Sequence, residues 1–108
     1  MEMRLRENGP DGFETIFLKG DCDLYSAPSL RKAILHRIGR GVRKLRLDFS
    51  AVGYLDSSGV GSIIQIMQAM KTARGELTFR GVQGAPKRVL EMSNIISLMR
   101  IESPEKVG

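Results

Sequence analysis

One segment, residues 45–64, changes its hydrophobic period from that of a strand to that of a helix. Leu45, Leu47 and Phe49 alternate with charged residues, which is typical of a strand with one buried face. The apolar residues farther along recur every three or four positions, as in an amphipathic helix: Val60, Ile63, Ile64, Met67 and Met70. The segment therefore predicts a strand, a tight turn at Asp56-Ser57-Ser58-Gly59 and a helix.

The predicted turn places two hydroxyl groups at a helix N-terminus. Unpaired N–H groups and the positive end of the helix dipole suit a negative group there, such as a phosphate. A serine in this position could thus be a covalent switch. The alternative is plain helix capping, the commoner role of Ser and Asp, and the two roles can coexist on neighbouring residues. The pair Gly59 and Gly61 does not make a nucleotide-binding loop, because the third glycine and the P-loop lysine are missing.

The rest of the chain continues the alternation of strands and helices. Expected strands are 3–7, 13–20, 43–49 and 76–80, expected helices are 26–38, 57–73 and 85–92, and a short helical or extended tail follows. The first two strands flank the turn Asn8-Gly-Pro-Asp-Gly12, which predicts an antiparallel hairpin. Short loops among the later elements favour parallel pairing.

The fold class expected from this order is a single α/β domain over residues 1–108. Its small mixed sheet combines the N-terminal antiparallel hairpin with parallel strands. Because strands 43–49 and 76–80 carry charge on one face, we expect the helices mainly on the other face. Gly75 is expected to end the helix 57–73. Ile66 falls off the apolar stripe of that helix, so we expect it to be exposed and available to a partner.

The run Tyr54-Leu-Asp-Ser-Ser-Gly-Val-Gly61 resembles the signature of the STAS domain family, in particular the bacterial anti-sigma-factor antagonists. Four further segments resemble other parts of that family in the same order: Gly20-Asp-Cys-Asp23, Gly75-Glu-Leu-Thr-Phe79, Pro86–Ser93 and Ile95–Ile101. Two residues depart from the pattern. Cys22 stands where an aliphatic residue is usual, and Asn94 stands where glycine is common, although Asn also accepts a left-handed cap.

The resemblance implies a function and a set of residues. In the antagonist branch the serine after the signature aspartate is phosphorylated, which corresponds to Ser57, with Ser58 as a possible second acceptor. The expected partners are an anti-sigma factor with serine kinase activity and a protein phosphatase. The unphosphorylated form would bind the anti-sigma factor and free the sigma factor, and phosphorylation would prevent binding. The expected partner-binding turn comprises Asp23, Asp56, Ser57, Ser58 and Gly59.

Three alternatives stay open. The chain could be a STAS module of another system: transporter-associated, chemoreceptor-linked or stress-sensing. Asp23 could simply cap the following turn, and the sequence does not decide whether a nucleotide binds weakly beside it.

The third alternative concerns the basic residues. Every charged residue from Arg31 to Arg46 is Lys or Arg, within a net charge of +5 for the chain. This run could attract nucleic acid, although it has no interleaved aromatic residue, so we favour a solvated face or steering of an acidic partner.

Other chemistry is not supported. One cysteine and one histidine cannot form a zinc site, and no catalytic triad spacing surrounds His36. We therefore expect no enzyme activity, no catalytic residue, no metal and no cofactor. Cys22 is expected to be a structural thiol, since the flanking Asp21 and Asp23 raise its pKa. The sequence has no signal-peptide pattern and no apolar run long enough for a membrane span, from which we expect a cytoplasmic protein.

Overall fold

The computed structural model describes residues 1–7 and 9–103; Asn8 of the predicted turn and the last five residues lie outside this range. The elements are β1 (Glu2–Arg6), β2 (Glu14–Cys22), α1 (Ala27–Gly39), β3 (Lys44–Leu55), α2 (Ser57–Thr72), β4 (Glu76–Arg80), α3 (Gly84–Met92) and the 3₁₀ turn η1 (Ile96–Leu98). The sheet has the order β1-β2-β3-β4. β1 pairs antiparallel with β2, and the other neighbours are parallel. The predicted mixed sheet is confirmed.

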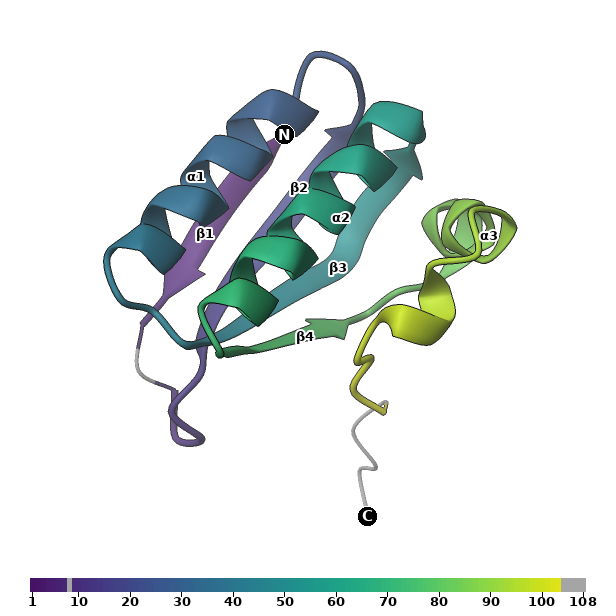
Figure 1. Cartoon of the computed structure of the whole chain (residues 1–108). Coiled ribbons are helices and arrows are strands. Elements are labelled where there is room, and N and C mark those ends of the chain that lie inside the picture. Colours follow the sequence, from purple (N-terminus) through teal and green to yellow (C-terminus); the bar gives the residue numbers. More distant parts are fainter. Residues whose placement is uncertain (8, 104–108) are drawn as a thin grey trace.

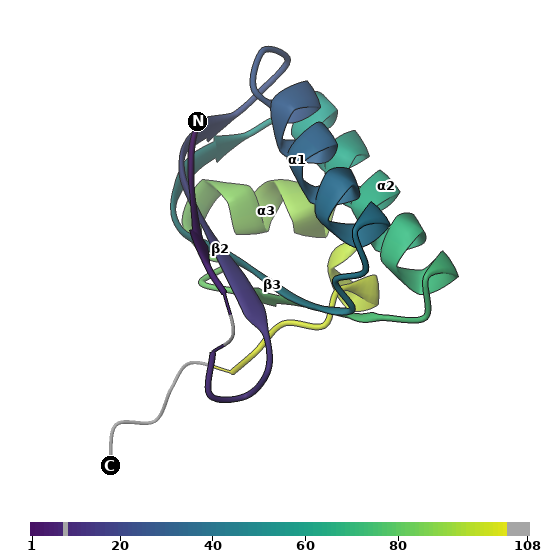
Figure 2. The ribbon, with the colours of Figure 1, turned by 90° about the vertical axis from the view of Figure 1, so that its left-hand side faces the viewer.

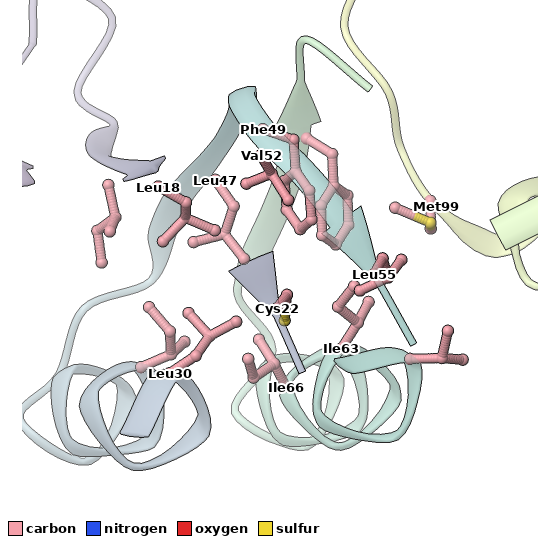
Figure 3. Packing of buried hydrophobic residues seen from close by; sticks show 14 of the residues in the cluster. Leu18, Cys22, Leu30, Leu47, Phe49, Val52, Leu55, Ile63, Ile66 and Met99 are labelled. Carbon is pink, nitrogen blue, oxygen red and sulfur yellow. The ribbon is translucent and has the colours of Figure 1, made fainter. Parts of the chain in front are cut away.

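The helices leave one face of the sheet open. α1 and α2 lie side by side on the same face, and α3 lies beside the second half of β3 (Figures 1 and 2). Between this helix layer and the sheet, residues such as Leu18, Leu30, Leu47 and Ile63 form a continuous apolar core (Figure 3). None of the helices in the described part of the chain combines the length and the hydropathy needed to cross a membrane.

β3 is longer than the predicted strand 43–49, because it continues to Leu55. Its register with β2 shifts twice, so that β3 contributes extra residues between Asp48 and Ala51 and again between Val52 and Tyr54. Such bulges bend a strand and change which residues point inward. The buried apolar residues are accordingly spaced by two up to Phe49 and by three thereafter, at Val52 and Leu55. The regular alternation of apolar residues therefore ends at the first bulge, whereas the strand itself continues to Leu55.

The expectation that Ile66 is exposed is wrong, because its side chain is fully buried. α2 packs on the sheet and also against α1, so its buried arc is wider than a stripe facing a sheet alone. Figure 3 shows Ile66 on the side of α2 that faces α1. Met67, assigned to the core stripe with Met70, is only partly buried at the edge of the core.

All three α-helices end in the same hydrogen-bonded motif. After α2, the N–H of Gly75 donates to the Met70 carbonyl and the N–H of Arg74 donates to that of Lys71, which defines a Schellman cap. The residue in the left-handed conformation is Arg74 (φ 60°), not the predicted Gly75. Gly75 is required by space instead, since a Cβ there would lie 2.8 Å from the backbone carbonyl oxygen of Arg43 and 2.3 Å from the Met70 sulfur. Asn94 (φ 57°) caps α3, as its residue type predicts.

The open face of the sheet is covered by side chains in ion pairs. Arg46 is buried and donates to Glu102 (2.6 Å), to Thr15 (3.0 Å) and to Asp11. Next to it, Arg80 donates to Asp48 (2.9 Å). Arg46 and Arg80 also lie over the rings of Phe13 and Phe17. We call these residues the ionic layer: Asp11, Phe13, Thr15, Phe17, Arg46, Asp48, Thr78, Arg80 and Glu102. This layer shields the sheet, whose last three strands are parallel, on the face where residues 1–7 and 9–103 place no helix.

Candidate functional site

The turn that joins β3 to α2 is organised by Asp56. Its carboxylate accepts hydrogen bonds from the N–H groups of Ser58 (2.9 Å) and Gly59 (3.1 Å), as an N-cap residue does. Its own N–H donates to the carbonyl of Cys22 at 3.2 Å, which ties the turn to the end of β2. Asp56 therefore already satisfies two of the N–H groups that the sequence suggested were available to an anion. Ser57, the first residue of α2, is exposed, and Ser58 is partly buried.

Gly59 brings the first turn of α2 into direct contact with the ends of two strands. A Cβ at this position would lie 2.4 Å from Leu55 Cδ1, 2.7 Å from the Cys22 carbonyl oxygen and 2.8 Å from the Cys22 sulfur. No side chain other than hydrogen fits there without movement. The glycine of the signature thus sets how close Ser57 lies to the loop that follows β2.

Asp23 organises that neighbouring loop. Its carboxylate accepts hydrogen bonds from the N–H groups of Tyr25 (2.9 Å) and Ser26 (3.0 Å), and its own N–H donates to the Ser26 hydroxyl (2.9 Å). The hydrogen bond from the Ser26 N–H holds the pKa of Asp23 below its ordinary value. The capping role is therefore present. The sheet also brings Asp23 close to the turn, because the adjacent Cys22 carbonyl accepts the hydrogen bond from Asp56.

Cys22 is fully buried beneath the turn (Figure 3). Burial, together with the nearby carboxylates of Asp56 and Asp23, raises the pKa of its thiol to about 11. A thiol of this kind is protonated at neutral pH and is a poor nucleophile. The interpretation of Cys22 as a structural thiol is supported. The carboxylates that raise its pKa are those of Asp56 and Asp23, and not the predicted pair of Asp21 and Asp23.

Sequence reasoning missed the exposed apolar side chains around this site. Leu24 is 63% exposed, Tyr25 is 88% exposed and Tyr54 is 48% exposed. Leu24 and Tyr25 lie in the loop between β2 and α1, and Tyr54 lies near the end of β3, at the same end of the molecule as the start of α2 (Figure 1). The available signal was a pair of apolar residues directly after the predicted turn at Asp23. We call the surface formed by Asp23, Leu24, Tyr25, Tyr54, Asp56 and Ser57 the switch face.

The basic run from Arg31 to Arg46 does not form one patch. Arg37 pairs with Glu14 and Glu7, and Arg46 belongs to the ionic layer on the opposite side of the sheet from α1. Arg43 donates to the carbonyls of Ile38 and Val42. The structure thus uses several of these cations locally. His36 is exposed on α1, and among residues 1–7 and 9–103 no cluster of His, Cys, Asp and Glu is arranged to hold a metal ion.

A four-stranded mixed sheet with helices on one face and a capped serine turn at one end defines a small α/β domain. The model of the STAS domain matches residues 5–106, and the chain belongs to this family.

Within this family, the chain is similar to proteins named anti-sigma factor antagonists. The anti-sigma-B factor antagonist of Listeria monocytogenes is 26% identical over 106 residues, which cover 97% of this chain and 91% of that protein. Among solved structures, the anti-sigma factor antagonist SpoIIAA in its unphosphorylated form superposes with a TM-score of 0.74 at 19% identity, covering 96% of this chain and 90% of that one. The phosphorylated form of SpoIIAA, described as a Bacillus cell fate determinant, gives a TM-score of 0.72 at 21% identity, with coverage of 94% and 92%.

Proposed function

We propose that the chain is an anti-sigma-factor antagonist whose binding is controlled by phosphorylation of Ser57. The unphosphorylated switch face binds an anti-sigma factor and thereby frees a sigma factor. The single observation that carries this proposal is the placement of Ser57: it is exposed, at the first position of a capped helix, and at the same end of the molecule as the exposed Leu24 and Tyr25. The anti-sigma factor acts as the serine kinase, and a phosphatase restores the free hydroxyl. The name of the Listeria relative supports the choice of partner.

The chemistry of the switch face indicates which partner surface would fit it. Its exposed side chains are aromatic and aliphatic, and its charges are the carboxylates of Asp23 and Asp56, with Asp21 close by. A complementary surface would offer an apolar pocket together with Lys or Arg. Tyrosine is a frequent anchor of such interfaces. We therefore assign Tyr25, the more exposed of the two tyrosines, as the main apolar contact.

Phosphorylation would act on the interface more than on the fold. A phosphoryl group adds about −1.5 to −2 charges at pH 7. At Ser57 it would stand in solvent next to Asp56, whose carboxylate is held by two N–H groups, so the helix could remain intact. In a bound complex the same group would lose part of its hydration, and its repulsion by the carboxylates of Asp56 and Asp23 would grow as water is excluded, so both effects oppose association.

The first test is a pull-down from lysate of the source organism with the wild type, Ser57→Ala and Ser57→Asp, followed by mass spectrometry. We expect Ser57→Ala to retain a kinase-fold partner and Ser57→Asp to lose it. Adding ATP to the wild-type complex should phosphorylate Ser57. Ser97→Asp, which places the same charge on an exposed serine of η1, is the matched control and should bind normally. Equal recovery of the partner with the wild type, Ser57→Ala and Ser57→Asp would contradict the switch.

A second comparison tests the docking surface without reference to phosphorylation. Tyr25→Ala should weaken binding of the captured partner at least tenfold, because it removes an exposed aromatic anchor. Met92→Ala truncates an equally prominent apolar side chain on α3 and should leave binding unchanged. If the partner recovered is a transporter or a sensor protein and not a kinase-fold protein, the alternative STAS systems replace the sigma-factor mechanism.

A further inference from the structure

A second apolar feature lies toward the other end of α2 from the switch face. A groove of about 440 Å³ runs between the C-terminal half of α2, strand β4 and the segment around η1. Ser57 and Lys71, which lines the groove, are separated by about 21 Å along the helix at 1.5 Å per residue. Figure 1 shows β4 between the last turns of α2 and η1. We call this feature the α2–β4 groove.

The interior of the α2–β4 groove is mainly hydrocarbon and sulfur. Phe79 and Ile95 are buried in the core, and Ile64, Met67 and Leu77 are only partly buried at its edge. Leu98 from η1 stands at the lip and is 70% exposed. A concave, mostly apolar site of this size is in the range that binds small molecules. Unbranched Met67 can change rotamer to fit a flexible chain.

Two cations stand at the rim of the groove. Lys71 comes from the last turn of α2, and Arg100 follows η1; both are exposed, and neither forms an ion pair within residues 1–7 and 9–103. Glu76 is the acidic residue of the lining, so the charged groups of the rim sum to a net positive charge.

The backbone around Arg100 is held in place. The N–H of Phe79 donates to the Arg100 carbonyl at 2.9 Å, and the N–H of Glu102 donates to the Phe79 carbonyl at 2.8 Å. The segment after η1 thus continues the sheet beside β4, through a parallel bridge between Phe79 and Ile101. The wall of the groove that carries Arg100 is therefore a fixed part of the fold.

We propose that the α2–β4 groove binds a small anionic amphiphile, a medium-chain carboxylate, independently of the phosphorylation of Ser57. The alkyl chain lies between Met67, Leu77 and Leu98, and the carboxylate reaches Lys71 and Arg100. The combination of an apolar interior with cations confined to the rim selects this class over a neutral hydrocarbon or a fully polar anion. The ligand leaves the switch face accessible, because it occupies the distant half of α2.

The test is a titration of the ¹⁵N-labelled full chain with decanoate below its micelle concentration, compared with decanol. We expect saturable shifts confined to residues of the groove, and at least tenfold weaker binding of decanol, which has the same chain without the charge. In the double variant Lys71→Gln/Arg100→Gln, decanoate should lose this advantage while decanol binds as before. The matched control Lys32→Gln/Arg40→Gln removes two exposed cations from the region of α1 and should keep the advantage.

Three results would overturn the proposal. The first is the absence of saturable shifts with decanoate. The second is a set of shifts spread over the whole surface, which would mean nonspecific adsorption. The third is equal preference for decanoate in the rim and control variants, which would remove Lys71 and Arg100 from recognition. Decanol binding by the double variant reports independently that the groove is still folded, so a loss confined to decanoate is interpretable.

Discussion

Two glycines of α2 should respond in opposite directions to the same substitution. Gly59→Ala should lower the free energy of unfolding by about 1–3 kcal/mol, because the added methyl group overlaps Leu55 and Cys22 in a packed region. Gly61→Ala, for which a Cβ meets nothing within 4 Å, should raise it by about 0.5–1 kcal/mol through helix propensity. Urea unfolding monitored by circular dichroism measures both. Destabilisation of equal size by both variants would show that the contact at Gly59 is not the cause.

Asp56 should contribute to stability through its side-chain cap as well as to the switch face. Asp56→Ala removes the acceptor for the N–H groups of Ser58 and Gly59. It should lower the free energy of unfolding, measured by urea titration, by about 0.5–2 kcal/mol. Asp56→Asn keeps a capping oxygen and should retain most of the stability. Asp21→Ala is the control for the loss of one exposed carboxylate in the same region and should change stability little. Wild-type stability of Asp56→Ala would contradict the capping role.

At the scale of elements, the sequence predicts the order and type of the four strands and three α-helices that the structure describes, because their hydrophobic periods differ, whereas it left the segment that forms η1 as helical or extended. The features that the sequence could not predict depend on contacts between different strands and helices. The bulges of β3 arise from pairing with β2 and break the period of two after Phe49. Ile66 is buried because the neighbouring helix α1 covers it. The hydrophobic pattern of one helix does not show which other helix will pack against it. The turn at Asp56-Ser57-Ser58-Gly59 follows from a local motif, whereas its apolar surroundings at Tyr25 and Tyr54 come from separate elements.

The end of α2 carries a conformational cost that can be relieved. Arg74 adopts the left-handed conformation, which disfavours residues with a Cβ. Arg74→Gly should therefore raise the free energy of unfolding by about 0.5–1 kcal/mol, since glycine adopts φ > 0 without strain. Ala73→Gly, one residue earlier at φ −77°, should destabilise the protein instead. Thermal melts of the two variants provide the comparison, and an equal change in both would mean that strain at Arg74 is negligible.

At the scale of the whole molecule, the ionic layer joins segments that are distant in the chain. Arg46 on β3 contacts Asp11 of the N-terminal hairpin and Glu102 of the C-terminal segment. Burial alone would raise the pKa of Glu102, but hydrogen bonds from Thr78 and Arg46 outweigh it, and the pKa is lowered. For Asp48, burial is likewise outweighed by hydrogen bonds from Ser50 and Arg80. The hydrogen bond from Arg46 also lowers the pKa of Asp11.

These lowered pKa values determine how stability should depend on pH. A carboxylate with a lower pKa in the folded state stabilises the fold above its unfolded pKa, near 4–4.5 for Asp and Glu, and this contribution disappears as the pH falls through the folded pKa. The protein should therefore lose stability progressively below about pH 5.

In Arg46→Gln the unfolding free energy at pH 7 should fall by about 1–3 kcal/mol, because a buried charged donor is lost. Its further decrease between pH 7 and pH 4 should be smaller than in the wild type, because Glu102 and Asp11 lose the part of their pKa depression that comes from Arg46. Urea unfolding at pH 7, 5 and 4 measures this slope, and Arg40→Gln controls for the loss of one positive charge. An unchanged slope in Arg46→Gln would mean that the acid sensitivity comes from the net charge of the molecule and not from the ionic layer.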